Sequence, residues 1–335
     1  MADVKKIDLA LQGGGAHGAY TWGVIDRLLD DERIEIEGIS GTSAGAMNGV
    51  CTIYGLKKGG RNLAKHTLVK FWHKISEAGK LSPIQPSWLD KMMSPGNMDF
   101  SPTYKWFSAV TENFTPKQLN PLQYNPLERI LNQVIDFNEL HQINPPKLFV
   151  CTTNVKTCEA RIFGREEITA KSILASACLP YMYDAVEIDG EYYWDGGYSG
   201  NPLIEPLIDH TEEANDILLV QINPKNIKNV PDNIEGIRDR INELSFNSSL
   251  LLELRLIQFK QQLIEKGITL DGALRPVYLH NISADEELSE LNLSSKLNTS
   301  WDFMMYLKEL GYKACANWIE ANFEHIGKKN TMKLP

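Results

Sequence analysis

Short apolar runs alternate with amphipathic stretches over the first quarter of the chain. Residues 7–11 and 34–39 have the length and composition of buried strands. A helix is predicted from the turn after the first run to about Asp30, and a second helix from the turn after the second run towards Tyr54. Strands that alternate with helices in this way predict a parallel sheet.

The strand pattern returns in the second half of the chain. Further strands are predicted at residues 147–152, 161–163, 186–188, 192–194, 217–222 and 277–282. Residues 170–178 have helical character. The dipeptide Asp189-Gly190 lies between two of these strands and is typical of a hairpin turn. The sheet is therefore expected to continue well beyond the first quarter.

Three other stretches are predicted to be helical. Residues 57–146 are rich in Pro, Trp and Met, a composition that predicts short helices and loops. The apolar residues of this stretch would suit a cap with its own small core, or a lid that contacts acyl chains. Residues 237–266 have the apolar spacing of a long amphipathic helix, which favours packing on the sheet; contact with a membrane or a partner is the alternative. Residues 301–326 are also predicted to be helical.

The pattern as a whole predicts one domain over residues 5–330. It would carry a helical cap or insert at about 57–146 and a helical C-terminal part at about 236–330. With 335 residues, the chain is long enough for such a domain to bury a sizeable core.

Charge and composition narrow the classes of partner. A net charge of −9 argues against a nucleic-acid partner and against broad electrostatic attachment to an anionic membrane. No apolar run approaches the ~20 residues of a membrane span, and no signal peptide pattern is visible. We therefore expect a soluble protein made in the cytoplasm, and export by a route without an N-terminal signal is compatible with this sequence.

The serine at position 43 lies in a motif that suits a nucleophile. Residues 41–45 read Gly-Thr-Ser-Ala-Gly, a G-x-S-x-G motif between a predicted strand and a predicted helix. A nucleophilic serine needs a sharp turn that exposes its hydroxyl, and flanking glycines permit that turn. The N-terminus of the following helix favours developing negative charge. An ordinary strand-to-helix turn is the structural alternative.

The glycine-rich turn at residues 13–18 suits an oxyanion hole. Ester hydrolysis generates an oxyanion that needs preorganised N–H donors, often worth about 3 kcal/mol each. Three successive glycines expose such backbone groups. The same residues match the G-x-G-x-x-G turn of dinucleotide-binding proteins, which needs an acidic residue at the end of the second strand. Glu35 and Glu37 come close to that place, but the strand ends in the serine motif instead.

A serine nucleophile needs a base, and an aspartate is the best-placed candidate. None of the seven histidines lies in a recognisable local sequence motif. Asp195, by contrast, follows a predicted strand and precedes a glycine pair. A carboxylate can accept the serine proton directly when the two groups are held in contact. Taken alone, the same residues would also suit a plain Asp-Gly turn.

The three motifs occur in a characteristic order. A triple-glycine loop, G-x-S-x-G and D-G-G each follow a predicted strand, and in this combination the chain resembles the patatin-like phospholipases from residue 7 to about residue 207. The resemblance implies a three-layer α/β fold with a central, largely parallel sheet between helices. It also implies hydrolysis of acyl esters of phospholipids and neutral lipids, commonly without calcium.

The resemblance assigns roles to individual residues. Ser43 would be the nucleophile and Asp195 the proton acceptor of a Ser–Asp dyad. The oxyanion donors would be Gly13, Gly14, Gly15 and Ala44, and the supporting motif residues are His17, Gly18, Gly41, Gly45, Gly196 and Gly197. His17 is a departure, because the family usually has Arg or Lys there, so a titratable group replaces a fixed positive charge.

Other functions remain open at this point. An α/β-hydrolase triad would combine Ser43 and Asp195 with His210 or His280, although Ser43 follows only two strands, fewer than that fold normally has before its serine. A transacylase, a polyester hydrolase and a non-catalytic lipid-binding protein are further alternatives.

The sequence also limits the expected partners. It contains no His-Glu-x-x-His, cysteine cluster or Asp-rich calcium loop, so we expect no metal and no cofactor. The expected partner is a lipid ester substrate, with peripheral membrane contact and no nucleic acid.

Overall fold

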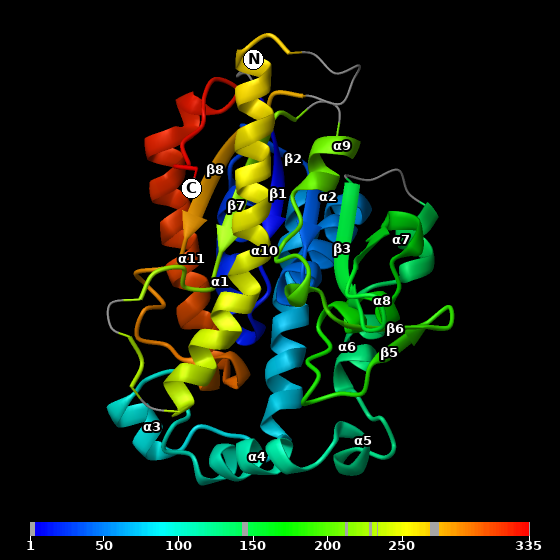
Figure 1. Ribbon diagram of the computed structural model, residues 1–335, viewed down its shortest axis with the longest axis vertical. Coiled ribbons are helices and arrows are strands. Elements are labelled where there is room, and N and C mark those ends of the chain that lie inside the picture. Colours follow the sequence, from blue (N-terminus) through cyan, green and yellow to red (C-terminus); the bar gives the residue numbers. More distant parts are fainter. Residues whose placement is uncertain are drawn as a thin grey trace.

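A single sheet organises the molecule (Figure 1). The computed structural model describes residues 4–142, 147–211, 214–227, 230–232, 234–268 and 275–334. In these ranges eight strands form the sheet in the order β5-β6-β3-β2-β1-β7-β8, with β4 paired to β3. The central strand β1 (Lys5–Leu11) pairs in parallel with β2 (Ile34–Gly41) and with β7 (Asp216–Gln221).

The remaining strands extend the sheet on both sides. On one side, β8 (Tyr278–Ser283) is parallel to β7; on the other, β3 (Lys147–Asn154) is parallel to β2. Beyond β3 the pairing becomes antiparallel, with strands β4 (Ala160–Gly164), β5 (Val186–Ile188) and β6 (Glu191–Asp195). The sheet is therefore largely parallel, as predicted, and each strand expected from the sequence is present.

Helices cover both faces of the sheet. On one face lie α1 (Gly18–Asp30), α2 (Ala44–Lys80) and α11 (Trp301–Asn322). The short helices α6 (Pro126–Val134) and α8 (Ala170–Ser176) add to the same core. On the other face lie α9 (Glu205–His210) and α10 (Ile234–Glu265), which crosses the front of the sheet in Figure 1. Alternate residues of β1 enter the two cores, and this arrangement confirms the three-layer α/β class.

The helix expected at residues 237–266 is present as α10. Its C-terminal half buries Leu250, Leu254 and Ile257 against the sheet, as predicted. Apolar residues nearer its N-terminus, among them Ile241 and Leu244, are exposed. Packing on the sheet therefore accounts for only part of the apolar pattern of this helix.

The first part of the predicted insert differs from the prediction. Instead of short helices, α2 continues to Lys80, with non-helical backbone only at Gly59 and Gly60. Five short helices follow: α3 (Trp88–Met93), α4 (Pro102–Asn113), α5 (Pro116–Leu119), α6 (Pro126–Val134) and α7 (Phe137–Gln142). Three of them begin with proline after a Ser, Thr or Asn cap, a sequence typical of helix N-termini. Residues 143–146 of the insert lie outside the described ranges.

The apolar residues of the insert are divided between interior and surface. Met98 and Leu131 are buried, whereas Trp88 and Trp106 are 68% and 63% exposed, and Met92 and Met93 are exposed as well. A cap with its own core therefore does not account for all of them. In Figure 1 the helices α3, α4 and α5 lie together at the end of the molecule towards which strands β7 and β8 point.

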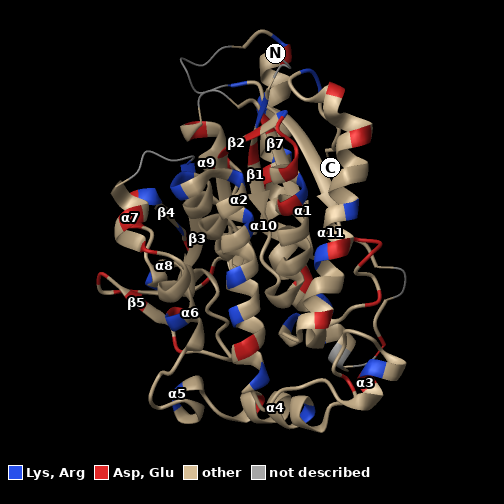
Figure 2. Ribbon diagram, turned by 180° about the vertical axis from the view of Figure 1, so that it is seen from behind, with Lys and Arg blue, Asp and Glu red and all other residues tan. Residues whose placement is uncertain are grey.

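Acidic and basic residues are interspersed along the ribbon in Figure 2. Among the described residues, no helix combines the length and the hydropathy that crossing a bilayer requires.

Candidate active site

Strand register brings the three motifs to one edge of the sheet. The glycine loop follows β1, Ser43 follows β2, and these parallel strands end side by side because Leu11 pairs with Gly41. Gly41 also pairs with Val150 of β3, and Asp195 pairs with Thr152, two residues further along that strand. Asp195 is therefore level with the turn that carries Ser43.

Ser43 occupies a sharp turn between β2 and α2. Its φ of 53° and ψ of −119° are strained for a residue with a side chain, as expected of a serine on a nucleophile elbow. The backbone N–H of Ser43 donates to Ser176 Oγ of α8 at 2.8 Å, which fixes the turn from the neighbouring helix. The Ser43 side chain remains partly exposed at the N-terminus of α2.

Asp195 is buried beside this turn, with 3% of its surface exposed. Its Oδ1 accepts a hydrogen bond from the Gly197 N–H at 2.7 Å. Burial raises the pKa of Asp195 from 3.8 to about 7, against the opposing effects of Gly197, Ser43 and Lys296. A base with a pKa near neutrality is well matched to proton transfer at physiological pH.

The glycine loop lies directly against the serine turn. A Cβ atom at position 13 would lie 2.7 Å from that of Ser43 and 2.9 Å from the Thr42 carbonyl oxygen, so only glycine permits this approach. The Gly13 N–H is already engaged, because it donates to Asn201 Oδ1 at 2.7 Å. This bond argues against Gly13 as an oxyanion donor.

Three of the four expected donors remain available. Within the described ranges, the N–H groups of Gly14, Gly15 and Ala44 have no hydrogen-bond partner. Ala44 begins α2, and Gly15 begins the short helix η1 (Gly15–His17), positions at which a helical N–H has no partner within the helix. The remaining motif residues frame these loops: Gly18 begins α1, Gly41 ends β2, Gly45 lies in the first turn of α2, and Gly196 and Gly197 begin η3 (Gly196–Tyr198).

His17 is a buried and uncharged member of the glycine loop. Its Nε2 atom lies 2.7 Å from Ser295 Oγ. Burial, and secondarily the positive charge of Lys296, lower the pKa of His17 to about 3. The position that is usually basic in the family therefore carries no charge at neutral pH.

The two histidines considered for a triad are engaged elsewhere. His280 Nε2 lies 2.8 Å from Asp216 Oδ1, and His280 Nδ1 lies 2.8 Å from Thr331 Oγ1. Asp216 is the first residue of β7, so this histidine lies at the opposite edge of the sheet from Ser43. His210 ends α9 and stacks on Phe149. No histidine in the described part of the chain hydrogen-bonds to Ser43 or Asp195.

Sequence reasoning missed several polar residues that hold the loops. Ser176 fixes the serine turn, Asn201 binds the Gly13 N–H, and Asn223 donates to the Gly13 carbonyl oxygen at 2.6 Å. Gln12 accepts from the backbone N–H groups of Ile222 and Asn223. None of these residues belongs to one of the three motifs, so no local signal identified them.

The fold and the three assembled motifs define an α/β protein of the lipid acyl hydrolase class. The chain belongs to the patatin-like phospholipase family, whose model matches residues 9–208. Among solved structures it is similar to VipD from Legionella pneumophila, with 15% sequence identity and a TM-score of 0.37 over 92% of this chain and 67% of that chain. A comparison with curated proteins found no match.

Proposed function

We propose that the protein is a serine acyl hydrolase of the lipase or phospholipase A type, which cleaves carboxylic esters of lipids through a Ser43–Asp195 dyad. The observation that carries the proposal is the position of the buried Asp195 carboxyl, which lies level with the Ser43 turn and has its pKa raised to about 7. Such a carboxylate is basic enough to take the serine proton as the hydroxyl attacks.

Acylation is the first step. Ser43 Oγ attacks the ester carbonyl carbon while its proton passes to Asp195, and the carbonyl oxygen becomes an oxyanion. The unpartnered N–H groups of Gly14, Gly15 and Ala44 are the proposed donors to this oxyanion, and the N-terminus of α2 adds a favourable dipole. The intermediate collapses, the proton moves from Asp195 to the departing alcohol oxygen, and an acyl-serine remains.

Deacylation reverses these roles. A water molecule gives its proton to Asp195 and attacks the acyl carbon, and the same N–H groups stabilise the second oxyanion. Collapse returns the proton to Ser43 Oγ and releases the fatty acid. Every proton transfer in the cycle uses Asp195, so no metal or cofactor is required.

The substrate class is proposed to be lipid because of the family and because of the apolar residues exposed at one end of the molecule. The exposed side chains of Trp88, Met92, Met93 and Trp106 lie on α3 and α4, at the end of the molecule where the carboxyl ends of the parallel strands point (Figure 1). Exposed apolar residues gathered at one end suit peripheral contact with a lipid surface.

The test is incubation with mixed phospholipids and neutral acylglycerols, followed by identification of the released fatty acids by mass spectrometry. Wild type is expected to release fatty acids, and Ser43→Ala and Asp195→Asn are expected to release none above background. The exposed Ser289, whose hydroxyl donates to the Glu286 carbonyl oxygen, provides a matched Ser289→Ala control that should behave as wild type. Equal release by wild type and Ser43→Ala would overturn the proposal.

A further inference from the structure

A lysine from the C-terminal part of the chain packs on the glycine loop. Lys296 belongs to the short helix η4 (Leu293–Leu297). A Cβ atom at position 15 would lie 2.4 Å from the Lys296 carbonyl oxygen and 3.3 Å from its Cβ, so η4 contacts the loop directly at Gly15. Gly15 also has a φ of 59°, which favours glycine at the same point.

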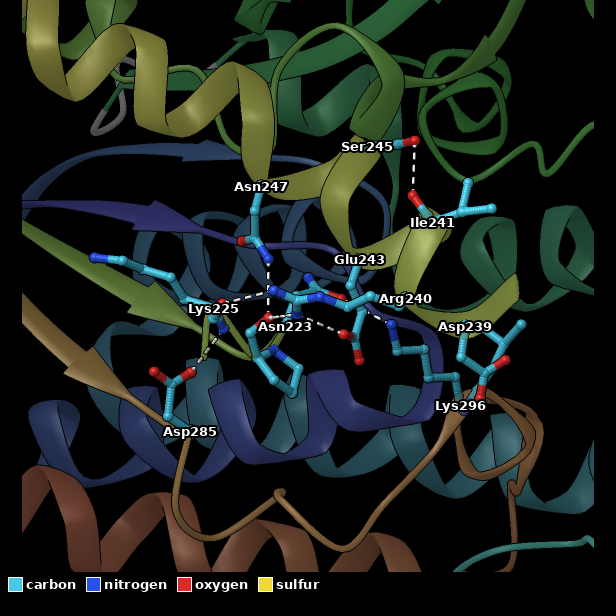
Figure 3. Close-up of polar contacts among 12 residues, drawn as sticks. Asn223, Lys225, Asp239, Arg240, Ile241, Glu243, Ser245, Asn247, Asp285 and Lys296 are labelled. Carbon is cyan, nitrogen blue, oxygen red and sulfur yellow. Dashed lines mark hydrogen bonds and ion pairs between the residues drawn. The ribbon is translucent and has the colours of Figure 1, made fainter. Parts of the chain in front are cut away.

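The ammonium group of Lys296 is connected to the loop backbone through one side chain. Lys296 Nζ donates to Asn223 Oδ1 at 2.8 Å, the bond drawn in Figure 3. Asn223 Nδ2 in turn donates to the Gly13 carbonyl oxygen at 2.6 Å. The backbone N–H of Asn223 is held by Gln12 Oε1 at 3.0 Å, so the asparagine is fixed from both its backbone and its side chain.

The bond to Gly13 acts on the neighbouring N–H. The Gly13 carbonyl and the Gly14 N–H belong to one planar trans peptide unit, so they point in opposite directions and rotate together. A donor that holds the carbonyl therefore also sets the direction of the Gly14 N–H. Hydrogen bonds in a chain polarise one another, and a cation at the far end strengthens the effect, so the Gly14 N–H becomes a better donor.

Lys296 is also close enough to influence the charges around the site. Its positive charge lowers the pKa of His17 on η1 and of Asp195 on β6. The acids that act on Lys296 are Glu243 and Asp239 of α10, together with Asp195. Glu243 acts on two basic side chains, Lys296 and Arg240, because it also forms an ion pair with Arg240 at 2.9 Å (Figure 3). Burial lowers the pKa of Lys296, and the three acids oppose this effect.

We propose that Lys296, acting through Asn223, is a positioning residue for the oxyanion hole. It orients and polarises the Gly13–Gly14 peptide, and it supplies from η4 the positive charge that the neutral His17 does not provide within the loop. This inference rests on the proposed function and deepens it. It also places a functional residue outside residues 9–208, the part of the chain that the family model matches.

The first experiment compares Lys296→Met and Lys296→Arg in the hydrolysis of a p-nitrophenyl acyl ester across pH. Lys296→Met is expected to lower kcat about tenfold with KM within about twofold of wild type, because the lost effect acts on the transition state. The acid limb of kcat/KM should also move to higher pH, since Lys296 lowers the pKa of Asp195. Lys296→Arg should recover most of kcat. An unchanged kcat and an unmoved acid limb in Lys296→Met would overturn the inference.

The second variant tests the connection through Asn223. Asn223→Asp keeps an oxygen for Lys296 but removes the donor to Gly13, so kcat should fall although Lys296 is present. Lys225→Met is the matched control, because the Lys225 side chain extends away from Lys296 in Figure 3, and it should retain wild-type kinetics. Wild-type kcat in a folded Asn223→Asp protein would overturn the role of Asn223.

Thermal unfolding of each variant separates loss of fold from loss of rate. Ser43→Ala is included in the same assay. Turnover that depends on Ser43 but not on Lys296 overturns this inference alone, whereas turnover that does not depend on Ser43 overturns the proposed function and the inference with it.

Discussion

At the scale of single residues, the site depends on how a buried carboxyl is balanced between two protonation states. Burial favours the neutral acid, whereas the Gly197 N–H, the Ser43 side chain and the Lys296 charge favour the carboxylate, and the resulting pKa of Asp195 is about 7. A carboxyl with the ordinary value of 3.8 would be a much weaker base towards a serine hydroxyl.

The first prediction concerns pH. The catalytic form has Asp195 deprotonated, so kcat/KM should rise with pH through about 7 and fall roughly tenfold per unit well below it. Initial rates between pH 5 and 9 on a soluble ester measure this limb. A rate that is constant down to pH 5 would contradict the assignment of Asp195 as base.

The second prediction concerns stability. Because the folded-state pKa of Asp195 lies above its usual 3.8, the folded protein binds this proton more tightly than the unfolded chain. The stabilisation is complete below about 3.8 and is lost as pH rises through about 7. Asp195→Asn should therefore have a higher Tm than wild type at pH 8, and the difference should be smaller at pH 4.5. The Asp209→Asn variant, at an exposed position on α9, is measured beside it as the matched control.

At the scale of helices and strands, the regular elements were predictable because each has a local signal. Apolar runs located β1, β2 and β7, and Asp189-Gly190 located the β5–β6 turn, where both residues have positive φ. The length of α2 was not predictable, because Gly59-Gly60 resembles a helix end while tertiary packing of Leu68 and Phe71 continues the helix beyond it.

The site was predictable only where its residues share a motif. Ser43 and Asp195 were identified from local sequence, and strand pairing places Asp195 level with the turn that carries Ser43. Asn201, Asn223 and Lys296 reach the loop from segments about 190 to 280 residues away along the chain, and side-chain bonds of that kind leave no local pattern. For the same reason the engagement of the Gly13 N–H could not be foreseen.

The third prediction belongs to the packing of α1 on α11. A Cβ atom at Gly311 would lie 2.0 Å from the Tyr20 carbonyl oxygen, so the two helices cannot keep their separation if that position carries a side chain. Gly311→Ala should destabilise the protein by about 1–3 kcal/mol despite the better helix propensity of alanine. Chemical denaturation measures the loss. Asn317→Ala, on the exposed side of the same helix, should change stability by less than about 0.5 kcal/mol.

At the scale of the whole molecule, the sheet extends beyond the part that the family model matches. That match ends at residue 208, yet β7 is hydrogen-bonded to the central strand β1 and β8 to β7. The later helices α10 and α11 cover the two faces of the same sheet. A single domain over residues 5–330 stays a prediction that this continuity favours.

The fourth prediction concerns the apolar end formed by α3 and α4. With a net charge of −9, the protein should bind a lipid surface through apolar contact rather than charge, so it should co-sediment with neutral phosphatidylcholine vesicles. Replacing both Trp88 and Trp106 by serine should reduce the bound fraction several-fold, because these two indole rings are largely exposed. Tyr306→Ser, an exposed aromatic residue on α11, is the control. Equal binding of the double variant would exclude this end as the contact surface.

The whole account depends on Ser43 being a nucleophile that Asp195 activates. Reaction with a fluorophosphonate probe, followed by mass spectrometry of the labelled peptide, tests this most directly as the fifth prediction. The adduct should map to Ser43 in wild type, be absent from Ser43→Ala, and form at least tenfold more slowly in Asp195→Asn. Labelling of Ser43→Ala at the wild-type rate, or an adduct on another residue, would contradict the account.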